Sequence, residues 1–214
     1  MLIKNLGTLI SGGTNSINLG GSTTAVPANV ATVFYGNQTN QALGAGQVVF
    51  GDIDDDNYSD DLVFGAVQGG TSWRGSAYVV KNVGTKPGMI NVDTNYQRID
   101  LNIYAGSIFD DFGGTAIAFV DGNGDGKEND LLIASYYSSS PGRSSNGIIS
   151  LIKDINLKLG SINLGTAAGR AKVDLNILGD LNSDYLGSTG FSQGDLDHDG
   201  IKETIEWFEK TYTV

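Results

Sequence analysis

The stretch VDGNGDGKENDLLIAS, residues 120–135, places an acidic ladder directly before an apolar run. Asp121, Asn123 and Asp125 occupy alternate positions of the ladder, and Gly126 follows as a residue type that tolerates a positive φ. When such a loop folds, oxygens from positions 1, 3 and 5 and the backbone carbonyl of position 7 converge on one point. Oxygen-rich loops of this kind are typical of Ca²⁺ sites, whereas Zn²⁺ sites use His or Cys.

The same pattern occurs twice more, in GDIDDDNYSDDLVFGA (residues 51–66) and GDLDHDGIKETIEW (residues 194–207). One such loop could be an Asp-rich turn that binds nothing, but three copies in register favour metal binding, so we predict three structural Ca²⁺ ions. The predicted ligands, counting the carbonyl at position 7, are Asp52, Asp54, Asp56, Tyr58 and either Asp60 or Asp61 in loop 1; Asp121, Asn123, Asp125, Lys127 and Asp130 in loop 2; and Asp195, Asp197, Asp199, Ile201 and Glu203 in loop 3. Asp61 is favoured over Asp60 because it directly precedes the apolar strand.

Each acidic loop belongs to a longer repeat. A glycine after a bulky apolar residue precedes every loop at a fixed distance, as Leu43-Gly44, Phe112-Gly113 and Leu186-Gly187. Behind loops 1 and 2 the segments follow one order: a short apolar run (62–66, 131–135), a polar stretch, a second apolar run (75–82, 147–154) and an alternating run (98–106, 172–180). Alternation of apolar and polar residues is typical of a half-buried strand. One unit is therefore predicted to hold four strands, the first two of which flank the acidic loop.

These units predict an all-β chain that forms a single domain over residues 1–214. The content of 31 glycines and only 3 prolines suits many short strands joined by turns. The repeats cover approximately residues 37–106, 107–179 and 180–214. The last repeat is completed by residues 1–36, because MLIKNLG (1–7) matches YVVKNVG (78–84). The termini are thus circularly offset, and we expect residues 1–36 to pair with residues 186–214.

These motifs resemble the FG-GAP repeat of integrin α-subunit β-propellers and their bacterial relatives. The resemblance rests on Phe112-Gly113, on the loop from Asp121 to Gly126 and on the run from Leu131 to Ala134; after Gly65-Ala66, Val67 replaces the proline of the family pattern. It implies a β-propeller of four-stranded blades, about three per chain, with calcium loops on one face and ligands on the other. Three blades are too few to close a ring, since propellers hold about 4–8. The chain is therefore expected to form a homo-oligomer or to be part of a longer propeller.

Loop 3 also fits an EF-hand, because Glu206 falls at its position 12. An EF-hand needs a helix on each side, yet the stretch before loop 3 is rich in glycine and the stretch after it favours a strand. Loops 1 and 2 carry Val63 and Leu132 at position 12, which excludes an EF-hand there. The EF-hand is therefore an alternative for loop 3 alone.

Charge and composition limit the partners and the compartment. A net charge of −11 argues against nucleic acid and anionic membrane surfaces, and no apolar run approaches membrane-spanning length. Cysteine is absent, so the sequence offers neither disulfides nor thiol chemistry. The expected location is extracellular or on the cell surface. Residues 1–13 are too short and glycine-broken for a secretory signal, so three alternatives stay open: a cytosolic chain, export without an N-terminal signal, or release from a longer precursor.

The sequence does not favour an enzyme. Its single histidine, His198, lies inside loop 3, where a side chain normally points to solvent. Four carboxylates outside the loops could serve sugar hydrolysis: Asp110, Asp111, Asp180 and Asp184. Turn polarity explains those before the glycine turns more simply, so no catalytic residue is predicted.

A binding or adhesion module is the favoured function. In a four-stranded unit the polar stretches 67–74 and 136–143 lie on the rim opposite the acidic loops. Their aromatic and arginine side chains are candidates for recognising a glycan or a protein: Trp73, Arg74, Tyr136, Tyr137 and Arg143. Two alternatives stay open. The aromatics could only cap the edges of the units while the arginines balance the acidic charge, or the chain could be a structural subunit for self-assembly.

Overall fold

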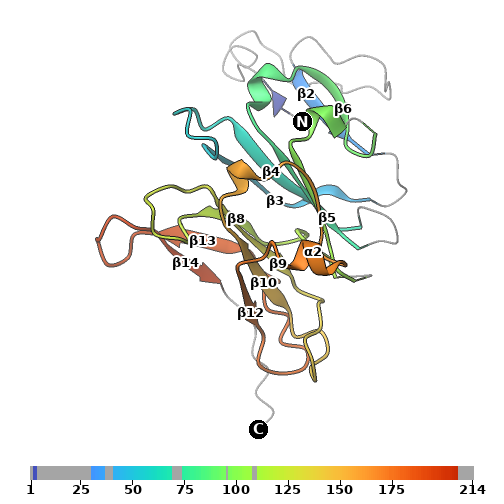
Figure 1. Ribbon diagram of the computed structural model, residues 1–214, viewed down its shortest axis with the longest axis vertical. Helices are drawn as coiled ribbons and strands as arrows, with labels where there is room; N and C mark the ends of the chain where they lie inside the picture. The colour runs from blue at the N-terminus through green and yellow to red at the C-terminus, as the bar shows by residue number, and fades with distance from the viewer. Residues whose placement is uncertain are drawn as a thin grey trace, which may run out of the picture.

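The computed structural model describes residues 2–3, 30–36, 41–68, 74–94, 96–107 and 110–206. This part of the chain is mostly β, arranged in several small sheets, with only short helical turns (Figure 1). The all-β prediction is therefore confirmed at the level of fold class. None of the described helices is long and apolar enough to cross a membrane. The described strands do not form a closed propeller, so that finer prediction stays a proposal.

The four-stranded unit expected from the repeat occurs twice as an antiparallel meander. The strands of unit 1 are β3 (Leu43–Gly51), β4 (Asp61–Ala66), β5 (Ser76–Val80) and β7 (Leu101–Tyr104). The strands of unit 2 are β8 (Ile117–Val120), β9 (Asp130–Ser135), β10 (Ile148–Ile152) and β12 (Leu175–Leu178). In both units the acidic loop joins the first strand to the second, as the sequence predicts.

The connection between the third and fourth strands reaches back to the preceding sheet. In unit 1 it holds η1 (Val83–Thr85), β6 (Gly88–Asn91) and η2 (Tyr96–Arg98); in unit 2 it holds η3 (Ile155–Leu157), β11 (Gly160–Asn163) and α2 (Ala167–Arg170). β6 pairs in parallel with β2 (Val30–Tyr35), and β11 pairs in parallel with β7. The repeat pattern did not reveal these added strands, because they are short and lie inside stretches of variable length.

The ends of the described chain carry incomplete units. β1 (Leu2–Ile3) pairs with β2, while β13 (Phe191–Gly194) and β14 (Glu203–Glu206) form the hairpin that holds loop 3. Figure 1 shows the sheets following one another along the long axis, from β2 and β6 at the top to unit 2 and the β13–β14 hairpin below. The expected pairing of residues 1–36 with residues 186–214 is not seen among the described residues, where β2 pairs with β1 and β6. Residues 1, 4–29 and 207–214 lie outside the described part.

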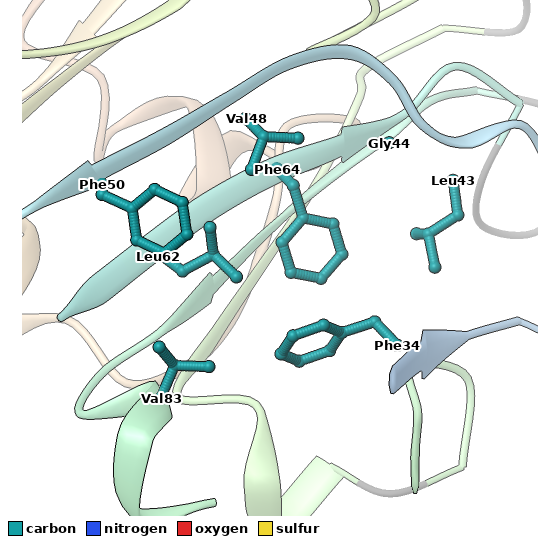
Figure 2. A pocket seen from close by; sticks show the side chains of 8 residues that line it. All are labelled: Phe34, Leu43, Gly44, Val48, Phe50, Leu62, Phe64 and Val83. Carbon is teal, nitrogen blue, oxygen red and sulfur yellow. The ribbon is translucent and has the colours of Figure 1, made fainter. Parts of the chain in front are cut away.

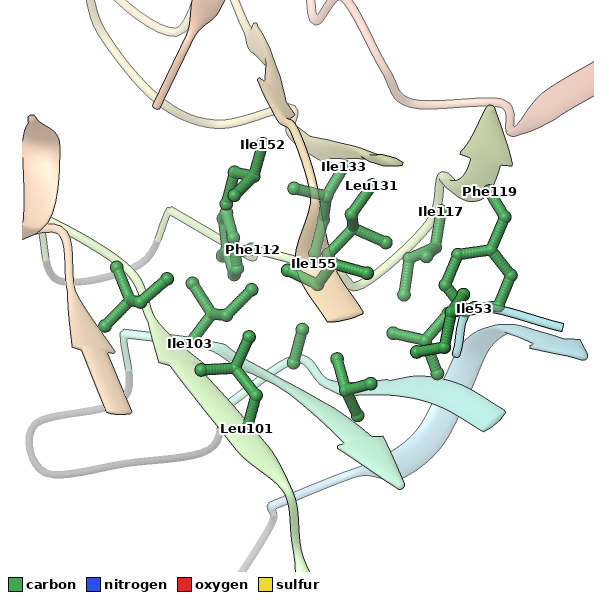
Figure 3. Packing of buried hydrophobic residues seen from close by; sticks show 14 of the residues in the cluster. Ile53, Leu101, Ile103, Phe112, Ile117, Phe119, Leu131, Ile133, Ile152 and Ile155 are labelled. Carbon is green, nitrogen blue, oxygen red and sulfur yellow. The ribbon is translucent and has the colours of Figure 1, made fainter. Parts of the chain in front are cut away.

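Each pair of neighbouring sheets encloses an apolar cluster. Between units 1 and 2, Ile117 and Leu131 of unit 2 face Ile103 of unit 1 (Figure 3). A second cluster lies on the other face of unit 1, and a third lies on the other face of unit 2. The central strands are buried on both faces, because alternate residues of β4 belong to different clusters. A strand that is covered on both faces requires a continuous apolar run, which explains residues 62–66.

The glycine turns before loops 2 and 3 pack against the second strand of the preceding unit. Phe112 is fully buried, and Gly113 adopts a positive φ of 69°. A Cβ atom on Gly65 would lie 2.0 Å from the carbonyl oxygen of Gly113, so unit 1 requires a glycine there. At the next junction a Cβ atom on Gly187 would lie 2.3 Å from that of Ala134. The small residues at the end of the second strand therefore serve this contact.

Candidate metal centres and the opposite rim

The three acidic loops share one backbone conformation. Position 6 has a positive φ in each loop and donates its N–H to the position-1 carboxylate: Asn57 to Asp52 (2.9 Å), Gly126 to Asp121 (2.8 Å) and Gly200 to Asp195 (3.1 Å). Position 7 donates its N–H to the position-5 carboxylate: Tyr58 to Asp56 (2.9 Å), Lys127 to Asp125 (3.0 Å) and Ile201 to Asp199 (2.8 Å). The alternating acidic pattern therefore folds each loop around its own carboxylates, in the register that the sequence predicts.

A carboxylate at the start of the second strand closes each loop. Asp61 is fully buried and accepts N–H groups from Ile53 (2.7 Å) and Asn82 (2.8 Å). In loop 2, Asp130 accepts the N–H groups of Gly122 (2.9 Å) and Asp154 (2.7 Å). In loop 3, Glu203 accepts a single N–H from the described residues, that of Leu196 (2.6 Å). The structure thus places Asp61, and not Asp60, at the position that Asp130 and Glu203 occupy in the other loops.

Two loops bring three carboxylates together. One oxygen each from Asp52, Asp54 and Asp61 lies within 4.8 Å of the other two, and the same holds for Asp195, Asp197 and Asp199. Both triads could hold a metal ion. The described carboxylates of loop 2 form no such group, because its position 3 is the amide of Asn123. That amide offers an oxygen of its own, and its nitrogen donates to Asp125 at 3.1 Å.

The electrostatics of the acidic loops favour a cation. Burial raises the pKa of Asp61 and of Asp130 above the usual value for aspartate, and burial together with Asp56 and Asp54 raises the pKa of Asp60. One buried oxygen of Asp54 and one of Asp195 have no hydrogen-bond partner among the described residues. An unpaired buried carboxylate oxygen is costly. A hard cation bound at either triad would supply the missing partner.

The acidic loops lie on one rim and contact one another through ion pairs. Asp55 of loop 1 pairs with Lys127 of loop 2 at 2.5 Å, and Glu128 of loop 2 pairs with Lys202 of loop 3 at 2.6 Å. In Figure 1 the loops after β3, β8 and β13 project to the same side of the molecule. Exposed pairs of this kind contribute little stability each. Their positions show that the three loops form one continuous surface.

The polar stretch after β9 forms an aromatic cluster. The rings of Tyr136 and Tyr137 lie 4.4 Å apart between centroids, and Tyr137 meets Tyr185 edge-on at 5.4 Å. Tyr137 and Tyr185 are exposed, while Tyr136 forms a side-chain hydrogen bond with Asp111. Sequence reasoning missed Tyr185. The sequence feature that could have identified it is its place directly before the Leu186-Gly187 turn, where the next unit meets unit 2.

The two arginines proposed for this rim occupy different surroundings. Arg143 pairs with Asp180 at 3.6 Å, so it does balance an acidic neighbour. Arg74 lies beside Gly165, in the connection that follows β11, and its buried Nε has no hydrogen-bond partner within the described ranges. Trp73 lies outside the described residues.

The carboxylates considered for sugar hydrolysis take structural roles in the turns. Asp110 accepts the N–H of Ser107 at 2.7 Å, and Asp184 accepts the N–H of Leu181 at 2.6 Å. Both are buried two residues before the apolar residue of the glycine turn. These contacts agree with the turn role expected from the sequence.

Comparison with protein-family models and with curated proteins finds no match for this chain. The case for a function therefore depends on the geometry of the loops and of the rim opposite them.

Proposed function

We propose that the chain is a calcium-stabilised β-propeller module of the FG-GAP type that binds an extracellular glycan or protein. One observation carries this proposal: the strands that open the three units, β3, β8 and β13, meet at a single side chain. Gln47 of β3 accepts the N–H of Ile117 at the start of β8 at 2.9 Å and donates to the carbonyl of Phe191 in β13 at 3.5 Å. First strands that converge on a common line are what a propeller requires, because its blades radiate from one axis.

Calcium would stabilise the contact between units as well as the loops. Position 2 of loop 1 is Ile53, which is fully buried in the cluster between units 1 and 2. Its N–H donates to Asp61, a member of the first acidic triad. A cation that fixes Asp61 therefore also fixes a core side chain. Coupling of this kind suits a structural ion of modest affinity, with a Kd of ~10⁻⁴–10⁻³ M as in extracellular modules.

The opposite rim is the proposed recognition surface. Its exposed tyrosines, Tyr137 and Tyr185, present a ring face and a hydroxyl group, which suit a sugar ring or a peptide. They lie where unit 2 meets the next turn, so rigid packing between units holds them in place. Self-assembly is a second candidate function, favoured by an apolar face of unit 1 that is described below.

The calcium part of the proposal is tested by thermal unfolding with excess chelator and with several millimolar CaCl₂. At tenfold excess over Kd, one site adds about 1.4 kcal/mol by mass action, so we expect a clear rise in Tm with Ca²⁺. Asp125→Ala should reduce this rise because it removes a ligand, whereas His198→Ala, in an exposed loop position, should preserve it. An identical Tm with chelator and with Ca²⁺ would refute the calcium sites.

The recognition part is tested on arrays of glycans and of extracellular matrix proteins. We expect binding by the wild-type chain to be lost in Tyr137→Ala and kept in Tyr58→Ala, which alters a more exposed tyrosine on the acidic rim. Binding that both variants retain would contradict the assignment of the recognition surface.

A further inference from the structure

One face of unit 1 is exposed although the same face of unit 2 is buried. The two hairpins share one register, since Phe50 pairs with Leu62 in unit 1 as Phe119 pairs with Leu131 in unit 2. Phe50 is 50% exposed, whereas Phe119 is 3% exposed. The position two residues earlier shows the same difference. Val48 is 48% exposed in unit 1, whereas its counterpart in unit 2, Ile117, is fully buried.

The exposed face forms an apolar groove. Phe50, Leu62 and Phe64 line it from unit 1, and Phe34 of β2 closes one side (Figure 2). The rings of Phe34 and Phe64 lie 4.9 Å apart between centroids. β2 therefore covers only the outer part of the face, and the part near Val48 and Phe50 stays open.

Unit 2 shows what covers this face when a complete unit precedes it. Ile53 and Val63 of unit 1 belong to the same cluster as Phe119, with Val49 packed against it. A Cβ atom on Gly51 would lie 2.6 Å from the ring of Phe119, which shows how closely the hairpin approaches. The missing cover on unit 1 is therefore a β-hairpin with an acidic loop, of the kind that β3 and β4 form.

The β13–β14 hairpin presents the matching surface. It aligns with β3–β4 because Gly194 pairs with Glu203 as Gly51 pairs with Asp61. In this alignment Leu196 takes the place of Ile53, yet it is 60% exposed where Ile53 is fully buried. The chain thus exposes both halves of a contact that it forms internally at the junction of units 1 and 2.

We propose that a second copy of the chain fills the groove. The β13–β14 hairpin of one copy packs on the β3–β4 face of the other, and Leu196 lies on the partner's Phe50 as Ile53 lies on Phe119. β14 pairs only with β13 in the described chain and has a free edge. In the dimer this edge lies beside the partner's β1, so that β13 and β14 of one copy and β1 and β2 of the other form a four-stranded unit. A head-to-tail contact of this kind closes into a ring when it is formed twice. Two copies then form six units, which is within the usual range of propellers.

This inference rests on the unit packing of the proposed propeller and not on its calcium or ligand sites. The two proposals can therefore fail separately: a monomer whose Tm rises with Ca²⁺ would refute the second copy and leave the calcium sites intact. A groove that is covered by another segment of the same chain would also leave the protein monomeric, and that result counts against the proposal.

The test is the mass in solution, by light scattering or sedimentation, of the full chain in Ca²⁺. We expect a pair of 22.5 kDa chains. Leu196→Glu and Phe50→Glu should each weaken association by about 30-fold or more, as loss of a central apolar anchor does. Leu157→Glu, at a leucine that is more exposed than Leu196, is the matched control and should keep the pair.

Mixing the two variants separates a head-to-tail contact from other dimers. Each variant keeps one intact half, so an equimolar mixture of Leu196→Glu and Phe50→Glu chains regains one complete interface and should associate, although each variant alone does not. A pair that neither substitution disturbs, or a mixture that stays monomeric, would overturn the proposed arrangement.

A cysteine pair gives a second measurement in case the glutamate variants fail to fold. The chain has no cysteine of its own, so Leu196→Cys and Phe50→Cys introduce single thiols. Under mild oxidation the mixture should form a crosslinked heterodimer, because the two positions face each other across the interface. The absence of that crosslink in folded protein would refute the contact.

Discussion

Loops 1 and 3 have the same local conformation but very different surroundings. In both, the position-6 N–H binds the position-1 carboxylate, and three aspartate oxygens lie close together. In loop 1 the closing Asp61 is buried and Ile53 is part of the core, while in loop 3 Leu196 is exposed. The acidic pattern alone therefore suffices to form the loop, whereas the neighbouring unit decides how strongly the loop is tied to the rest of the fold.

The closing carboxylates should show this difference most strongly. Asp61→Ala leaves three backbone N–H groups without their acceptor, those of Ile53, Asp54 and Asn82, and we expect it to cost about 3–5 kcal/mol of unfolding free energy. Glu203→Ala removes one exposed contact and should cost about 1 kcal/mol. Urea unfolding of both variants in Ca²⁺ measures the two losses, and equal losses would remove the distinction between the loops.

Position 2 of loops 1 and 3 offers a second test. Ile53→Ala creates a cavity between units 1 and 2 and should cost about 2–5 kcal/mol. At Leu196 the same truncation should cost about 0.5 kcal/mol or less in the dissociated chain, because the side chain is exposed there. Thermal unfolding at low protein concentration compares them. A large loss at Leu196 under those conditions would mean that this residue packs within its own chain.

The repeat made the local structure predictable. The spacing of Asp52, Asp54 and Asp56 gave the loop conformation, and the apolar run after Asp61 gave the second strand. These predictions succeeded because they depend on contacts within a few residues or on a strand that is buried on both faces. The sequence favoured Asp61 over Asp60 because Asp61 directly precedes the apolar strand; the distant N–H donor Asn82, which also holds Asp61, is specified by no local pattern.

The parts that the sequence could not supply depend on contacts between units. β6 and β11 are short, and they are strands only because a preceding fourth strand offers them a free edge. Tyr185 joins Tyr137 only because the next turn folds onto unit 2. The described strands do not show the pairing expected between residues 1–36 and 186–214 within one chain. Local periodicity carries no information on which chain provides a neighbour.

Glu206 provides the smallest and most specific test of the comparison. It occupies the register position of Phe64 and Ile133, so a carboxylate stands where units 1 and 2 place apolar residues. One of its oxygens accepts the N–H of Gly187 at 2.7 Å, and the other is buried without a partner in the described part of the chain. Burial raises the pKa of Glu206 to about 6, above the ordinary value of 4.5.

This pKa shift fixes the sign of a pH effect. The folded state holds the Glu206 proton more tightly than the unfolded state, so this group destabilises the fold above pH 6, and the penalty fades as the pH falls towards 4.5. Glu206→Gln keeps an acceptor for Gly187 and removes the charge. We expect it to raise stability at pH 7–8 by about 1 kcal/mol, an amount reduced by partial exposure to solvent. The gain should vanish below pH 4.5, and unfolding with chelator present isolates it from calcium binding. A gain that does not change with pH would show that the carboxylate is not desolvated, and that the third unit accepts a polar residue at this position without penalty.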